Sequence, residues 1–400
     1  MRIFLTALAL CVLAACSGAP LVDAPQEDQT VAKPTSLYFA TTRQIEDGQY
    51  GNARLDEPSF GRMEISIPKS SLLARNDDGQ IEGQRQALAG FATPQRLDLS
   101  RHYAVLANDP VVDRPSLVAR LRTELAANRA RAQQEAKATK KPPRPQGITV
   151  FVHGFNTPFG NAVYRLAQFA EDFDFSGSRG TIPVLYAWPS RGRLSAYLAD
   201  RESVLLEERH LEELLDDIAA AEPDFISIVA HSMGAQLTMQ TLRRVSVRGN
   251  TALLDKIQPV FLLAPDIDVE VFRNQVKDIG DVPQPFLILT SRRDLALRFS
   301  AIIRGGSERL GRAGEGSPVL GLPVTVIDAT AVNDGNLLGH DLGFTSDTLI
   351  ELVACVGEFT QFGRKPGQQA RYIALSPATE DTRRLCDLVK DPMDQPNAGG

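Results

Sequence analysis

One serine lies where a strand-like run meets a helix-like one, in the segment Ala230-His231-Ser232-Met233-Gly234. The run FISIVAHS before it is apolar, and Met233–Val245 has helical spacing. Small residues on both sides of a serine permit a sharp strand-to-helix turn that exposes the hydroxyl as a nucleophile. The usual motif begins with Gly, and Ala230 is a small substitute. A serine here can also serve only as a helix N-cap, but the whole pattern favours the nucleophile.

A serine hydroxyl reacts only when a base removes its proton and an acid orients that base. His340 is the only histidine after Ser232, and it lies in the turn-rich segment VNDGNLLGHD. Asp294 follows the apolar run PFLILTS, where the chain order serine, acid, histidine places the acid. Asp266 and Asp268, which follow the run PVFLLAP, are the alternative acids. We therefore expect Ser232, His340 and one of these carboxylates to act together.

The segment His153-Gly154-Phe155-Asn156 ends another apolar run, ITVFVHG. Backbone N–H groups of Phe155 and Met233 can together form an oxyanion hole, two donors aimed at the charge of a tetrahedral intermediate. His153 and His231 both end strand-like runs, and we expect them to form structural hydrogen bonds.

These residues must be positioned by a larger pattern of alternating strands and helices. Six short apolar runs are apolar on both faces: ITVFVHG, PVLYAWPS, FISIVAHS, PVFLLAPD, PFLILTS and VTVIDAT. Helical stretches separate or follow them at Phe159–Phe173, Tyr197–Ala221, Met233–Val245, Val269–Ile279 and Thr345–Phe362. Stretches of this length suit right-handed crossovers, so the pattern predicts an α/β fold with a doubly wound, mostly parallel sheet.

The segment before residue 147 has a different pattern. Leu37–Thr41, Arg62–Ile67 and His102–Leu106 are rich in aromatic and β-branched residues and are predicted as N-terminal antiparallel strands. Ser116–Lys137 has apolar residues at helical spacing and ends in a basic, proline-rich linker.

Composition narrows the class of protein. The chain has 400 residues, of which 43% are hydrophobic and 23% charged, with a net charge of -6. This is the composition of a globular protein, and its net negative charge does not indicate nucleic-acid binding. The five histidines are scattered and no CxxC is present, so we expect neither a metal nor another cofactor. No pattern indicates an oligomeric state.

The segments TVFVHGFNTPF, YAWPSRG, SIVAHSMGAQL, LAPDID, SRRDLAL and GHD resemble those of the α/β-hydrolase fold. More closely, they resemble a bacterial family of exported esterase- or lipase-like hydrolases long catalogued as a domain of unknown function, and FATTR and SFGRMEISIP are similar to that family's N-terminal strands. The likeness covers roughly Leu37 to Gly363 and implies hydrolysis of a small-molecule or lipid ester or another acyl bond. The competing interpretation is a non-catalytic envelope lipoprotein that uses the fold for binding or scaffolding.

The N-terminal segment has the features of an export signal. Ile3 to Cys16 is apolar but too short to span a bilayer, and Leu-Ala-Ala-Cys16 resembles a lipoprotein lipobox, which implies acylation of Cys16 and an anchor in the outer membrane facing the periplasm. Cys355 and Cys386 form a disulfide or remain two thiols.

The expected organisation has four parts: a signal at 1–15, a flexible tether at 16–36, a hydrolase domain at 37–365 and a tail at 366–400. Within the hydrolase domain, the N-terminal strands and helix take up 37–146 and the catalytic core takes up 147–365.

Two segments are candidates for the pocket that determines substrate specificity. They are Ser190–Asp200 and Phe299–Pro318. The second carries Arg304, Arg309 and Arg312, which could recognise an anion or could simply be solvated.

Overall fold

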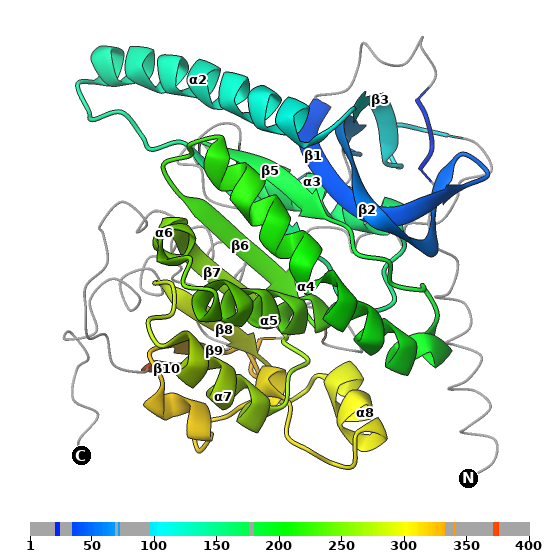
Figure 1. Ribbon diagram of the computed structural model, residues 1–400, viewed down its shortest axis with the longest axis vertical. Coiled ribbons are helices and arrows are strands. Elements are labelled where there is room, and N and C mark those ends of the chain that lie inside the picture. Colours follow the sequence, from blue (N-terminus) through cyan, green and yellow to red (C-terminus); the bar gives the residue numbers. More distant parts are fainter. Residues whose placement is uncertain are drawn as a thin grey trace.

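The computed structural model describes residues 21–24, 34–68, 71–72, 97–175, 180–332, 340 and 371–375. In this part of the chain one sheet holds ten strands in the order β10-β9-β8-β7-β6-β4-β5-β1-β2-β3 (Figure 1). Their bounds are β1 (Pro34–Glu46), β2 (Gln49–Ser66), β3 (Ala104–Val111), β4 (Gly147–Val152), β5 (Thr181–Tyr186), β6 (Ile226–His231), β7 (Ile257–Leu263), β8 (Phe286–Thr290), β9 (Thr325–Asp328) and β10 (Arg371–Ala374).

The sheet is parallel from β10 through β1, and antiparallel where β1 pairs with β2 and β2 with β3. The six apolar runs become β4 to β9, and the three earlier ones lie within or overlap β1 to β3. The predicted fold class, a mostly parallel doubly wound sheet with N-terminal antiparallel strands, is confirmed. The runs are apolar on both faces because both faces of the sheet are buried.

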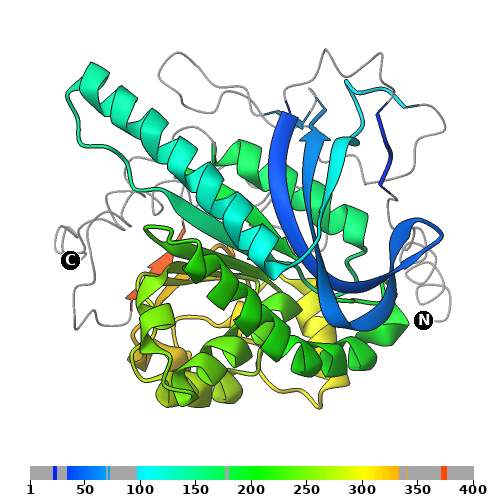
Figure 2. The same ribbon diagram turned by 45° about the horizontal axis from the view of Figure 1, so that its top comes forward.

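Helices cover the sheet on both sides. They are α2 (Arg114–Thr139), α3 (Phe159–Asp172), α4 (Tyr197–Ala220), α5 (Met233–Val247), α6 (Thr251–Lys256), α7 (Val269–Ile279) and α8 (Leu295–Ile303), with short 3-10 turns at Leu194–Ala196, Leu310–Arg312 and Pro318–Gly321. Helices α2, α4, α5 and α7 pack into one core cluster, and α3 packs into a second cluster on the opposite face. Figures 1 and 2 show α2 lying beside α4, near the antiparallel strands.

The two clusters draw on alternate residues of the same strands. In β6, Ile228 and Ala230 belong to the cluster under α4 and α5, whereas Val229 faces the cluster under α3. This alternation leaves the carboxyl ends of the strands as the place where polar groups collect.

Three features differ from the organisation expected from sequence. Residues 21–24, inside the expected flexible tether, hydrogen-bond to Val105 of β3, with Ala24 N donating to Val105 O at 2.8 Å. Strand β10 lies beyond the expected domain boundary at 365 and adds an edge strand to β9. Helix α8 was not predicted, and several of its apolar side chains, those of Leu295, Phe299, Ile302 and Ile303, are exposed. The expected helix at Thr345–Phe362 lies outside the described residues.

Candidate active site at the carboxyl edge of the sheet

Ser232 occupies the turn between β6 and α5. Its backbone has φ 52° and ψ -117°, a combination that residues with a side chain rarely adopt. Hydrogen bonds to the end of β7 and the loop after it hold the turn in place. Ser232 N donates to Leu263 O at 2.9 Å, and Ser232 O accepts from Asp266 N at 3.1 Å. Strain of this kind persists only where the surroundings enforce it, and it is typical of reactive sites.

Two glycines allow neighbouring backbone to approach this turn. A Cβ on Gly234 would lie 2.3 Å from His153 O, so a side chain there would collide with the end of β4. A Cβ on Gly154 would lie 2.9 Å from Ser232 Cβ. The small residues of the serine motif and of the HGFN segment are therefore required for the same reason: the two loops are in direct contact.

The alternative role of Ser232, as a helix cap, does not fit the geometry. Its side chain makes no capping hydrogen bond to α5, and its φ lies far from the extended values of capping residues. The residue is buried, with 4% of its surface exposed.

Backbone donors lie on both sides of this serine. Within the described part of the chain, neither the Phe155 N–H nor the Met233 N–H donates a hydrogen bond, although Met233 is buried and Phe155 partly buried. Phe155 packs edge-on against Tyr197, with ring centroids 5.3 Å apart. A buried N–H without a partner is costly, and such groups are found where a ligand supplies the acceptor.

Asp294 and His340 are brought together across 46 residues of sequence. His340 Nδ1 lies 2.6 Å from Asp294 Oδ2, and the Asp294 side chain is fully buried at the start of α8. The other oxygen of Asp294 accepts from Leu297 N at 2.8 Å and caps that helix. Because the carboxylate is an acceptor, His340 carries its proton on Nδ1, and Nε2 is left as the basic nitrogen.

His231 connects the imidazole to the serine turn. The rings of His231 and His340 have centroids 4.8 Å apart, and His231 Nε2 lies 3.2 Å from the backbone oxygen of His340. Since Ser232 directly follows His231, the acid, the histidine and the serine gather at one edge of the sheet. His231 thus has the structural role expected for it.

The alternative acids lie elsewhere. Asp266 is buried and accepts from Tyr197 Oη and Ser300 Oγ, each at 2.7 Å, with Arg309 Nε 3.7 Å away. Asp268 caps α7 by accepting from the backbone N–H groups of Glu270 and Val271. Neither carboxylate contacts His340 among the described contacts, whereas Asp294 does.

His153 also has the structural role that the sequence suggested. Its ring stacks on Trp188, and its two nitrogens lie 2.9 Å from Gly154 O and 3.0 Å from Trp188 O. Burial, together with the nearby charge of Arg43, lowers the pKa of His153 to about 3. The ring is neutral at ordinary pH and fixes the loop that contains Phe155.

Arg43 is a positioning group that sequence reasoning missed. It ends the apolar run of β1 and is fully buried, with Nη2 donating to Thr157 O at 2.8 Å and Nη1 donating to Ser190 O at 3.2 Å. Burial lowers its pKa to about 10, and the charges of Asp200 and Glu207 oppose that shift. The signal that could have revealed it was an arginine directly after a strand-like run, in FATTR.

Cys16, Cys355 and Cys386 lie outside the described residues. Within the described ranges, no three His, Cys, Asp or Glu side chains gather as metal ligands would. A search of the same ranges finds no helix with the length and apolar character needed to cross a bilayer.

Comparison with known proteins identifies the family. Residues 128–355, more than half of the chain, match the family described as "Alpha/beta hydrolase of unknown function (DUF900)", and the protein belongs to it. It is similar to an uncharacterized protein of Nostoc sp., alr1448, with 26% identity over 30% of this chain. The match spans 42% of the length of that relative. Among solved structures, Aspergillus fumigatus lipase B aligns over 60% of this chain and 56% of its own, with 12% identity and a TM-score of 0.39.

Proposed function

We propose that the protein is a serine hydrolase that cleaves an ester or another acyl bond through an acyl-enzyme. The observation that carries the proposal is the buried Asp294 carboxylate bound to His340 beside the strained turn of Ser232. An acid, a histidine and a serine in this arrangement form a nucleophilic triad. No metal or organic cofactor is needed for this chemistry.

The reaction follows from the groups present. Ser232 Oγ attacks the carbonyl carbon while His340 Nε2 accepts the hydroxyl proton, and the Phe155 and Met233 N–H groups donate to the oxyanion. The tetrahedral intermediate collapses as His340 returns the proton to the leaving alcohol. Water then attacks the acyl-enzyme by the same route and releases the acid. Asp294 holds the imidazole in one tautomer and stabilises the imidazolium formed in each step.

A fluorophosphonate probe tests the proposal. It bonds to the oxygen of an activated serine with loss of fluoride, so we expect the parent protein to be labelled on Ser232. Ser232→Ala should not be labelled. Ser300→Ala, which removes a buried serine bound to Asp266, is the matched control and should be labelled like the parent. A folded parent that resists the probe would favour the non-catalytic binding module.

A lipid anchor at Cys16 is a separate part of the proposal and rests on the lipobox alone. Several acyl chains on one cysteine are needed for stable attachment, because a single chain binds membranes only marginally. We expect the parent to sediment with membranes and Cys16→Ala to be released into the soluble fraction. Sedimentation of both forms with the outer membrane would place the anchor elsewhere.

A further inference from the structure

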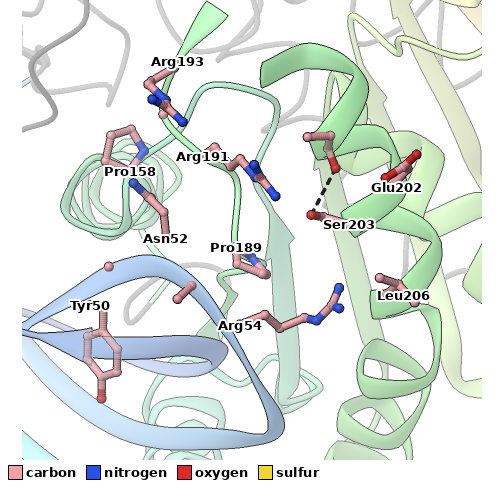
Figure 3. A pocket seen from close by; sticks show the side chains of 14 residues that line it. Tyr50, Asn52, Arg54, Pro158, Pro189, Arg191, Arg193, Glu202, Ser203 and Leu206 are labelled. Carbon is pink, nitrogen blue, oxygen red and sulfur yellow. Dashed lines mark hydrogen bonds between the residues drawn. The ribbon is translucent and has the colours of Figure 1, made fainter. Parts of the chain in front are cut away.

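A large hollow opens beside the loop that carries Phe155. Its volume is about 960 Å³, and its walls are the tip of the β1–β2 hairpin, Pro158, the loop after β5 and the first turns of α4 (Figure 3). The loop after β5 belongs to Ser190–Asp200, one of the two segments that sequence suggested for specificity. A volume of this size accommodates a small organic ligand.

The charge of the hollow is unbalanced. Arg54, Arg191 and Arg193 line it, and Glu202 is the only acidic residue among the described residues of its lining. None of the three arginines has an ion-pair partner among the described residues. Figure 3 shows Arg54 on the hairpin and Arg191 on the loop after β5, both extending toward α4. Guanidinium groups without carboxylate partners suit a carboxylate or phosphate, which they bind through paired N–H donors.

Buried contacts hold the two arginine-bearing walls in place. Arg43 Nη1 donates to Gly51 O at 3.0 Å on the hairpin and to Ser190 O on the loop. Asp200 accepts from Ser190 Oγ and from the Arg191 backbone N–H, at 2.6 and 2.9 Å. Both Asp200 oxygens are therefore bound by groups other than the arginine side chains.

The hollow and the proposed site share one loop, Gly154 to Pro158. Gly154 touches Ser232, and Pro158 lines the hollow. Four residues of extended chain span at most about 14 Å, so the near wall lies within that distance of the loop's contact with the serine.

We propose that this hollow binds an anionic group, carboxylate or phosphate, at the far end of the acyl substrate. The assignment rests on the proposed serine hydrolase and names its substrate class: an ester whose acyl chain ends in a negative charge. Arg191 and Arg193 bind the anion from one wall and Arg54 from the other. The Phe155 loop lies between the anion and the reacting carbonyl.

Two esters that differ only in charge test the assignment. They are 4-nitrophenyl hydrogen decanedioate, with a free carboxylate, and its neutral methyl ester. We expect the parent protein to give at least a tenfold higher kcat/KM for the charged ester. Arg191→Ala combined with Arg193→Ala should raise KM for the charged ester about tenfold and leave both the kcat and the neutral ester unchanged. Arg54→Ala should show part of the same effect.

Controls separate charge recognition from damage to the fold. The double substitution of Arg191 and Arg193 by Lys should retain part of the preference, and Arg131→Ala, which removes an exposed cation of α2 outside the hollow, should behave like the parent. Equal hydrolysis of the two esters by the parent would overturn the assignment. Equal slowing of both by the double Ala variant would show that the arginines only support the fold, and would also overturn it.

Binding to the Ser232→Ala variant decides the question without hydrolysis. Calorimetry should show that decanedioate monomethyl ester binds more tightly than inorganic phosphate, and that removal of Arg191 and Arg193 weakens it. Equal binding of inorganic phosphate would identify a free-anion site and overturn the substrate assignment. If the parent hydrolyses neither ester, the proposed function fails, and this binding measurement still tests the hollow.

Discussion

Two buried aspartates at the ends of neighbouring strands have different surroundings. Asp266, after β7, has both carboxylate oxygens bound by hydroxyl groups and a buried arginine close by. Asp294, after β8, binds one backbone N–H and one imidazole. Both residues are buried, with 2% or less of their surface exposed. Burial and position at a strand end therefore do not separate a structural acid from the proposed catalytic one. The difference is the partner, because an imidazole can pass a proton onward and the groups around Asp266 cannot at neutral pH.

The two serines of these regions should respond in opposite ways. Ser232→Ala removes the proposed nucleophile, so we expect loss of ester hydrolysis by about 10⁴-fold or more with little change in stability. Ser300→Ala removes a donor to the Asp266 carboxylate, which should lower the free energy of unfolding by about 1.5 kcal/mol with hydrolysis nearly unchanged. Steady-state kinetics and urea unfolding of both variants measure the contrast. Parental turnover by Ser232→Ala would remove the serine from the mechanism.

Substitutions of the two aspartates should likewise affect different properties, kcat for Asp294 and stability for Asp266. Asp294→Asn keeps an oxygen that can cap α8 but favours the wrong tautomer of His340, so we expect a loss of kcat on the order of 10⁴-fold. Asp266→Asn leaves the buried Arg309 without its charge partner and should cost about 3 kcal/mol of stability, with a much smaller loss of kcat. The reverse ranking in kcat would assign the acid to the end of β7.

Two other histidines should show opposite pH dependence of stability. The pKa of His153 is lowered to about 3, so between there and its ordinary value near 6.5 the unfolded chain binds a proton that the folded chain does not. The stability that His153 contributes falls as pH drops through this window, by up to about 1.4 kcal/mol per pH unit. Interaction with Glu207, whose carboxylate lies 3.5 Å from Nδ1, raises the pKa of His210, so its contribution is present at low pH and is lost as pH rises through the raised pKa.

Unfolding free energies between pH 4.5 and 7.5 measure these slopes. His153→Gln should remove part of the loss of stability at acid pH, whereas His210→Gln should reduce the loss on the alkaline side of its titration. The test compares how the unfolding free energy changes with pH, and not its absolute value, because each substitution also changes packing. Identical slopes in the parent and His153→Gln would mean that the buried ring does not resist protonation.

The smallest expected effect is a difference in stability between two variants of Ser232, which lies in the strained turn. The backbone angles of Ser232 are accessible to glycine but costly for other residues. Ser232→Gly should therefore be more stable than Ser232→Ala by about 1 kcal/mol, although neither variant hydrolyses esters. Comparing the two variants removes the contribution of the hydroxyl. A less stable glycine variant would show that the turn is relaxed.

The amino-acid sequence determined much of this protein by itself. Runs that are apolar on both faces predict buried parallel strands, and the small residues around Ser232 and after His153 predict loops in close contact. Both predictions depend on local properties, namely side-chain polarity and size at consecutive positions. For the same reason the proposed nucleophile and the proposed backbone donors could be selected from the sequence alone.

Only the tertiary structure distinguished Asp294 from Asp266, because both follow apolar strands and the difference lies in contacts with distant residues. Burial of Arg43, pairing of residues 21–24 with β3 and addition of β10 likewise depend on long-range neighbours. The arginines of the hollow come from a hairpin and a loop more than 130 residues apart in the sequence. Local patterns carry no information about such encounters, since these depend on how the strands are ordered in the sheet.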